Sequence, residues 1–190
     1  MSSMGVPREP TYSLLVVACF SRHLDALQWA TQQLTHRYGS VALTSPDFHF
    51  HHTKYYQTTM GTCLTKRLLA FQAIVPADCL PEVKRFTIGL EQELKEVGAF
   101  AEARPLNLDP GLVQLGKFLL ASTKDQAHRI YLRDDIFAEV TLRFEAGAFE
   151  AWPWTYADYR EEAVREFLNQ ARAYLYERVT ALRSAENRTE

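Results

Sequence analysis

The sequence predicts an α+β fold: a ferredoxin-like βαββαβ-type antiparallel sheet with helices on one face, extended by a C-terminal strand meander and helix. Three observations predict it. Apolar runs rich in β-formers alternate with segments of helical periodicity. Two of the helical segments are closed by a glycine, Gly39 and Gly98. Apolar residues at i, i+3, i+4 spacing recur between Val164 and Leu182.

The first half of the chain supplies the βαββαβ order. An apolar run at residues 12–20 predicts a strand, and the helix after it, with Ser21 as a candidate cap, ends at Gly39. A Pro-interrupted strand is expected at 41–52 and another at 66–75. A helix containing Val83 and Leu94 follows, and a strand near 104–108 completes the unit. The runs "LGKFLLAS", "HRIYL" and "IFAEVTLRF" then predict the meander.

Length and charge limit the class of protein. The chain has 190 residues, 47% of them hydrophobic, so we expect a single domain over residues 11–183, with flexible termini at 1–10 and 184–190. The 21 basic and 23 acidic residues leave a net charge of -2, which makes nucleic acid an unlikely partner by charge alone. No apolar run approaches the ~20 residues of a membrane span, and the start of the chain lacks a secretory signal pattern. We therefore expect a cytoplasmic protein without a membrane partner.

Cysteines and histidines give no convincing metal site. Cys19, Cys63 and Cys79 are widely spaced and form neither a C-x-x-C clip nor a disulfide framework, so buried or unreactive thiols are expected. His49 and His51 would share one side of a strand, but a clear third ligand is missing. The predicted metal ligands are therefore none.

The stretch "DPGLVQLGKF" imitates a phosphate-binding loop. Gly111, Gly116 and Lys117 have the G-x-x-x-x-G-K spacing, but Phe118 replaces the hydroxyl residue that would hold magnesium. An Asp-Pro-Gly turn followed by a strand is the expected structure, and a one-turn helix starting at Pro110 is the other ordinary possibility.

The stretch "HRIYLRDDIFAEVTLRF" predicts a hairpin with a polar face. A three-residue loop at 133–135 would pair Ile130 with Ala138 on an apolar face that also bears His128. The opposite face then contains Arg129, Tyr131, Glu139, Thr141 and Arg143. This face is either an ordinary solvated surface or a binding surface whose arginines hold an anion and whose Glu139 orients a substrate.

Residues next to this face complete the candidate site. His128 would be a core residue on this register, but a slip of one position would move it to the polar face. Lys124 and Asp125 lie in the adjoining loop, where residues held by a sheet often act. In "WPWTYADYRE", Asp158 with Glu161 has the spacing of a capping box for the final helix. The aromatic residues of this stretch could offer a stacking surface, but core packing is the expected arrangement.

Several ordered stretches resemble a known family. They are "NLDPGL", "LASTKDQAHRIYL", "FAEVTL" and "WTYADYR", with "YYQTTMG" and "LPEVKRFT" before them. Together they resemble the bacterial domain of unknown function 4416 family, whose members are often labelled GTP-binding. The resemblance implies a nucleotide ligand without assigning chemical roles. It marks these matching positions: Asn107, Asp109, Lys124, Asp125, His128, Arg129, Glu139, Thr141, Thr155, Tyr156, Asp158 and Tyr159.

The leading hypothesis is a domain that binds an anionic, phosphorylated small molecule or nucleotide on an open sheet face. The expected ligand-binding residues are Lys124, Asp125, Arg129, Tyr131, Thr141, Arg143, Asn107, Asp109, Tyr156 and Asp158. Replacing Arg129 is expected to weaken binding without unfolding the protein. The alternatives are a small hydrolase or transferase with His128 and Glu139 as catalytic residues, and a weak RNA-binding module. The sequence leaves any cofactor and the oligomeric state open.

Overall fold

The structure is a computed structural model that describes residues 12–50 and 57–186. The predicted flexible segment 1–10 lies outside the described residues. The predicted C-terminal tail was wrong in part, because the last helix continues to Glu186.

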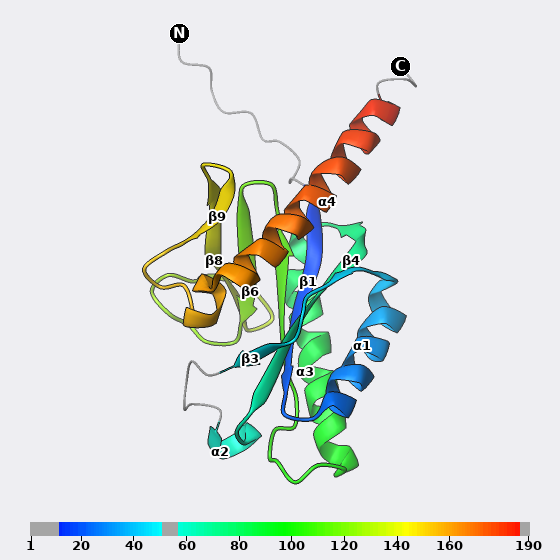
Figure 1. Ribbon diagram of the computed structural model, residues 1–190, viewed down its shortest axis with the longest axis vertical. Helices are drawn as coiled ribbons and strands as arrows, with labels where there is room; N and C mark the ends of the chain where they lie inside the picture. The colour runs from blue at the N-terminus through cyan, green and yellow to red at the C-terminus, as the bar shows by residue number, and fades with distance from the viewer. Residues whose placement is uncertain (1–11, 51–56, 187–190) are drawn as a thin grey trace.

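A large antiparallel sheet forms the body of the protein (Figure 1). Its strands are β1 (Ser13–Ser21), β2 (Val41–Thr44), β3 (Phe48–Phe50), β4 (Leu64–Val75), β5 (Asn107–Val113), β6 (Lys117–Ser122), β7 (Ile130–Arg133), β8 (Ile136–Glu145) and β9 (Ala148–Ala151). The order is β2-β4-β1-β5-β6-β8-β7, with β3 also pairing β4 and β9 also pairing β8. The helices are α1 (Leu24–Tyr38), α2 (Gln57–Met60), α3 (Leu80–Val97) and α4 (Glu162–Glu186), with short 3-10 helices η1 (Ala77–Cys79) and η2 (Ala157–Arg160).

The α+β class is confirmed, but helices cover both faces of the sheet rather than one. Helices α1 and α3 pack on one face, and α4 crosses the other, in front of β1 in Figure 1. Strand β1 explains the difference, since all nine of its residues are buried. A continuous apolar strand is typical of a sheet covered on both sides. The ferredoxin-like arrangement is not established for this nine-stranded sheet and its strand order.

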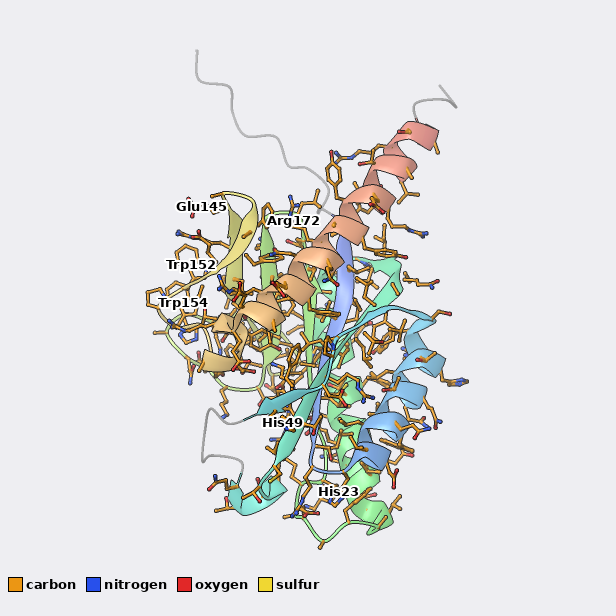
Figure 2. The ribbon with its side chains drawn as sticks, in the orientation of Figure 1. His23, His49, Glu145, Trp152, Trp154 and Arg172 are labelled. Carbon is orange, nitrogen blue, oxygen red and sulfur yellow. The ribbon has the colours of Figure 1, made fainter. Side chains whose placement is uncertain are left out.

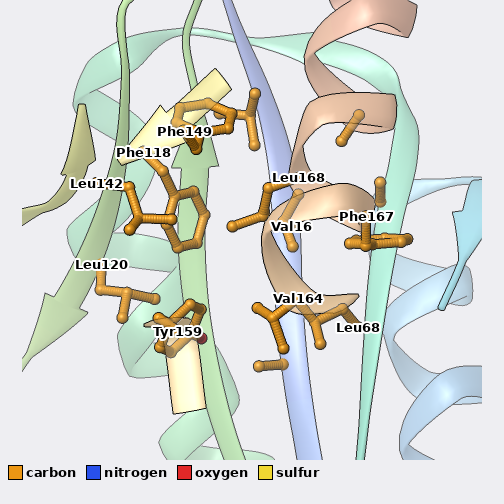
Figure 3. Close-up of a cluster of buried hydrophobic side chains, with 14 of the residues drawn as sticks. Val16, Leu68, Phe118, Leu120, Leu142, Phe149, Tyr159, Val164, Phe167 and Leu168 are labelled. Carbon is orange, nitrogen blue, oxygen red and sulfur yellow. The ribbon is translucent and has the colours of Figure 1, made fainter. Parts of the chain in front are cut away.

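The core beneath α4 joins the two halves of the sheet (Figure 3). Phe118 of β6 and Leu142 of β8 project toward Val164 and Leu168 of the helix. These four side chains are at most 1% exposed. The apolar stripe predicted along the final helix is therefore the stripe that binds the second face.

The β7–β8 hairpin has the predicted register with a different turn. Ile130 pairs with Ala138 and Tyr131 with Phe137, as expected. The turn consists of only Asp134 and Asp135, both with positive φ (54° and 60°). A register shift between Tyr131 and the end of β7 compensates for the shorter turn. Positive φ at both central residues is the geometry of a tight hairpin turn, which aspartate tolerates.

The segment from Gly111 to Lys117, which has the spacing of a phosphate-binding loop, forms part of the β5–β6 hairpin. Gly111 lies inside β5, Gly116 lies in the connection, and Lys117 begins β6. Asp109 and Pro110 also lie within β5, so the expected Asp-Pro-Gly turn and the one-turn helix were both wrong. No helix begins after the lysine, so the helix N-terminus that binds phosphate in such loops is missing at this point.

Gly111 is required by a close approach of neighbouring chain. A Cβ atom there would lie 2.4 Å from the Leu119 carbonyl oxygen and 2.7 Å from Cζ of Phe118. We predict that Gly111→Ala lowers the free energy of unfolding by about 1–3 kcal/mol, the usual cost of overpacking. Gly116→Ala is the matched control, because a Cβ atom at Gly116 meets nothing within 4 Å. Urea denaturation that gives both variants equal stability would contradict this account.

Candidate functional site

A cavity of about 470 Å³ opens where β5 and β6 separate. The two strands pair only from Gly111–Leu120 to Val113–Phe118, although β6 continues to Ser122. Beyond Gly111 toward its N-terminal end, β5 pairs with β1 alone. Pro110 lies where the pairing stops, and it has no amide hydrogen to donate. Polar residues of both strands, together with η2, therefore line an opening in the sheet.

Arg129 and Glu139 form one wall of the cavity. Their side chains are each 1% exposed, and Nε of Arg129 lies 2.9 Å from Oε2 of Glu139. The guanidinium also donates to Oγ of Ser122 (2.7 Å), to the Lys124 carbonyl oxygen (3.0 Å) and to the Tyr156 hydroxyl (2.5 Å). These bonds fix the guanidinium in one orientation. The predicted cross-strand pair therefore exists, but it is buried rather than solvated.

Both oxygens of Glu139 have partners. Oε1 accepts a hydrogen bond from the Thr141 hydroxyl at 3.1 Å. Oε2, already bound to Arg129, lies 3.3 Å from Nε2 of His128. His128 is therefore not the core residue that the predicted register favoured: its side chain is 23% exposed and stacks on Trp154. Glu139 links the cavity wall to a histidine at the surface.

Lys84 and Asp109 form a second, partly buried pair at the cavity. Nζ of Lys84 lies 3.0 Å from Oδ1 of Asp109 and 2.9 Å from the Leu108 carbonyl oxygen. Nδ2 of Asn107 donates to Oδ2 of Asp109 at 2.7 Å. Burial raises the pKa of Asp109, but the Lys84 charge and these hydrogen bonds outweigh it and keep that pKa below its ordinary value. Asp109 is therefore a carboxylate at neutral pH.

Lys66 and Asp158 form the third pair. Nζ of Lys66 lies 2.5 Å from Oδ2 of Asp158, and the lysine side chain is 1% exposed. The ammonium also lies 3.7 Å from the ring centroid of Tyr159. Asp158 was expected to cap the last helix, but it lies in η2 and its side chain binds β4 instead. The contact attaches η2, and with it one side of the cavity, to the sheet.

The structure brings together most of the predicted site. Seven predicted residues line the cavity: Asn107, Asp109, Lys124, Arg129, Glu139, Tyr156 and Asp158. Thr141 and His128 contact Glu139 but do not themselves line the cavity. Asp125, Tyr131 and Arg143 do not line it.

The predicted open polar face is thereby corrected in part, because Tyr156 contacts Arg129 and η2 lines the cavity beside Glu139. Tyr131 is 56% exposed and packs against Phe137 on the hairpin. Arg143 binds Glu145 and Glu150.

Three basic residues near the cavity were missed. Lys84 and Arg104 line it, and Lys66 lies behind Asp158. A signal was available for Lys66, which alternates with Leu64 and Leu68 on a buried face of β4. A charged residue at such a position requires a buried partner. The partner itself could not be identified, because it lies 92 residues away in the sequence.

The aromatic residues of the Trp152–Tyr159 stretch divide between core and surface. Tyr159 is 2% exposed and belongs to the core, as predicted. Trp152 and Trp154 stack on each other with ring centroids 5.2 Å apart, at one side of the molecule (Figure 2). Trp154 is 39% exposed and Tyr156 46% exposed, so core packing was wrong for these two.

Within the described residues, no three His, Cys, Asp or Glu side chains are grouped as metal ligands. His49 lies in β3, and His51 is outside the described residues. The three cysteines are free thiols, of which Cys19 is buried and Cys63 exposed. None of the helices in residues 12–50 and 57–186 combines the length and apolar character needed to span a bilayer.

These features define an α+β domain with a polar cavity bordered by three ion pairs, of which Arg129–Glu139 and Lys66–Asp158 are buried. The profile of the family described as "Domain of unknown function (DUF4416)" matches residues 11–175, and the chain belongs to this family. No curated protein and no solved structure matches the chain.

The Lys66–Asp158 pair makes a stability prediction. Lys66→Met leaves the Asp158 carboxylate without its cation, so we expect the free energy of unfolding to fall by about 3–5 kcal/mol. Arg67→Met is the matched control: the next residue along β4 pairs with Asp47, whose side chain is 40% exposed. Such an exposed pair contributes about 0–1 kcal/mol. Similar losses for the two variants in urea denaturation would show that the buried pair has no special role.

Proposed function

We propose that the protein binds a phosphorylated small molecule or a nucleotide in the cavity between β5 and β6. The supporting observation is a cavity lined by four basic side chains from separate segments: Lys84, Arg104, Lys124 and Arg129. Its volume, about 470 Å³, lies in the range of small-molecule sites. The proposal moves the ligand from the open sheet face expected from the sequence to this opening in the sheet.

The charges of the cavity favour an anion at its mouth. Asp109 and Glu139 are compensated by Lys84 and Arg129 within the lining. Asp158, the third carboxylate of the lining, is compensated by Lys66 behind it. Arg104 pairs with Glu91, which does not line the cavity, at 2.8 Å. With Lys66 and Glu91 included, five basic side chains stand against four carboxylates at the cavity.

Lys124 is the best residue at which to test this charge. It is exposed in the β6–β7 loop and lines the cavity. Phosphate oxygens prefer such a flexible ammonium or a guanidinium.

Arg129 is a poor position at which to test binding. Its removal would leave Glu139 buried without its cation, which destabilises a protein by about 3–5 kcal/mol. We therefore expect Arg129→Ala to destabilise the protein, contrary to the expectation from the sequence that Arg129 can be removed without unfolding. Lys124→Gln removes a cavity charge without disturbing a buried pair.

Our prediction concerns thermal stability with inorganic phosphate, sugar phosphates and nucleoside mono-, di- and triphosphates. A binding compound at 100 times its dissociation constant raises the stability by about 2.7 kcal/mol, or Tm by roughly 5–10 °C. Lys124→Gln should weaken its binding about tenfold or more, the effect of one lost charge-assisted contact. Lys95→Gln, at the exposed end of α3, makes the same charge change away from the cavity and should bind normally. A panel without any shift in Tm would reject the proposal.

A second candidate, a hydrolase or transferase, has one supporting observation. His128 lies within 3.3 Å of Glu139, which orients a histidine as a catalytic carboxylate would. The bonds from Arg129 and Thr141 to Glu139 support a positioning role for this carboxylate rather than a proton-accepting one.

His128→Gln tests the catalytic alternative. If His128 is a general acid or base, a phosphatase and phosphotransfer screen should find wild-type turnover that falls about 10²–10⁴-fold in the variant. Trp154→Phe, which keeps an aromatic partner for the histidine, should retain most of the turnover. Undiminished turnover in His128→Gln would exclude this role.

An RNA-binding role receives less support. The order β2-β4-β1-β5 supports a ferredoxin-like description of the N-terminal half, whose open sheet face could accept bases. Helix α4 occupies that face here. Filter binding to single-stranded RNA at low salt is the direct test, and no retention would end this reading. The cytoplasmic location stays a prediction.

A further inference from the structure

The inner part of the cavity is rich in hydrogen-bond acceptors. Asp109 uses one acceptor site on each oxygen, for Lys84 and for Asn107. A carboxylate offers about four such sites. Asp109 faces the cavity with its side chain 27% exposed, so it retains acceptor capacity toward a ligand.

Two further acceptors in the lining lack partners among the described residues. Asn107 is 2% exposed, and its amide donates to Asp109, while its Oδ1 accepts no hydrogen bond. Asp158 is 7% exposed, and only its Oδ2 is bound, by Lys66. A polar side chain this deeply buried normally has its hydrogen-bonding groups satisfied. Neither remaining oxygen is among the buried side-chain atoms without a partner, so both are accessible from the cavity, where a ligand can donate to them in place of water.

The chemistry of these donors is restricted. Each carboxylate already has a buried cation, Lys84 for Asp109 and Lys66 for Asp158. A further cation, such as an amine or a divalent metal ion, would gain little there and would be repelled by these lysines and by Arg104. Hydroxyl groups donate hydrogen bonds without adding charge, and they suit acceptors whose charge is already compensated.

We infer that the cavity recognises a polyhydroxylated phosphate ester, such as a sugar phosphate, with its hydroxyl groups on Asn107, Asp109 and Asp158. The phosphate group lies toward Lys124 at the exposed side. This inference rests on the proposed function, which supplies the phosphate, and adds the part of the ligand that the acceptors select. An analogue without hydroxyl groups would leave these acceptors unpaired, so the site should discriminate strongly against it.

The test uses two probes with equal carbon number and the same phosphate group. Isothermal titration calorimetry of the full chain with D-ribose 5-phosphate and n-pentyl phosphate isolates the hydroxyl groups. We expect D-ribose 5-phosphate to bind at least tenfold more tightly, since a hydrogen bond to a charged acceptor contributes roughly that factor or more. Inorganic phosphate and D-ribose alone should each bind more weakly than the ester.

Asn107→Ala separates recognition from general binding. It removes the Oδ1 acceptor, together with the hydrogen bond from Nδ2 to Asp109, while leaving all three ion pairs intact. The preference for D-ribose 5-phosphate should fall to about threefold or less, with the affinity for n-pentyl phosphate unchanged. Gln72→Ala, an exposed amide on β4 that does not line the cavity, should keep the wild-type preference. If Asn107→Ala does not fold, the wild-type comparison alone decides.

The outcomes distinguish the two proposals. Equal affinity of the wild type for both esters would overturn hydroxyl recognition and leave phosphate binding in place. D-ribose binding as tightly as its phosphate ester would overturn the proposed function, because the phosphate would contribute nothing. Binding of none of the four probes would overturn hydroxyl recognition, and together with a thermal panel without any shift in Tm it would overturn both.

Discussion

The separation of β5 from β6 is the constraint on which the candidate site depends. Each strand keeps one neighbour beyond the last shared pair, β1 for β5 and β8 for β6, so the sheet remains continuous on either side. The pair at Gly111 is so close that only glycine fits against the Leu119 carbonyl oxygen. Tight contact at Gly111 and lost pairing after Pro110 together convert a flat sheet into one with an internal opening. Asn107 and Asp109 of β5 therefore line a cavity at a point where a continuous sheet would place a paired strand.

The ion pairs fix the shape of this opening, because they hold the segments around it in place. A buried pair contributes little to stability compared with an apolar replacement, because both ions lose their hydration. Its geometric effect is larger: Arg129 contacts Glu139, Ser122 and Tyr156 from three different segments, which fixes their relative positions. Lys66 does the same for η2. A cavity fixed in this way loses little conformational freedom when a ligand binds.

The segment that leads into α4 contributes to the environment of these charges. The Arg129–Glu139 pair on an uncovered hairpin would be an ordinary cross-strand contact contributing tenths of a kcal/mol. With Tyr156 bonded to the guanidinium and η2 at the cavity, the two side chains of this pair are each 1% exposed. Tyr156 and Asp158 reach the cavity because they lie in the segment that leads into α4. The segment that leads into the helix completing the core therefore also lines the site.

Local patterns determined the elements of this protein. The apolar run of β1, the glycines that close α1 and α3, and the alternation in β7 and β8 each depend on residues near in sequence, so the sequence predicted them. The same alternation selected Arg129 and Glu139 as partners. Only the tertiary structure decided that α4 covers the second face, that β5 and β6 part, and that Lys66 meets Asp158. Those outcomes depend on packing between segments far apart along the chain, which no local periodicity encodes.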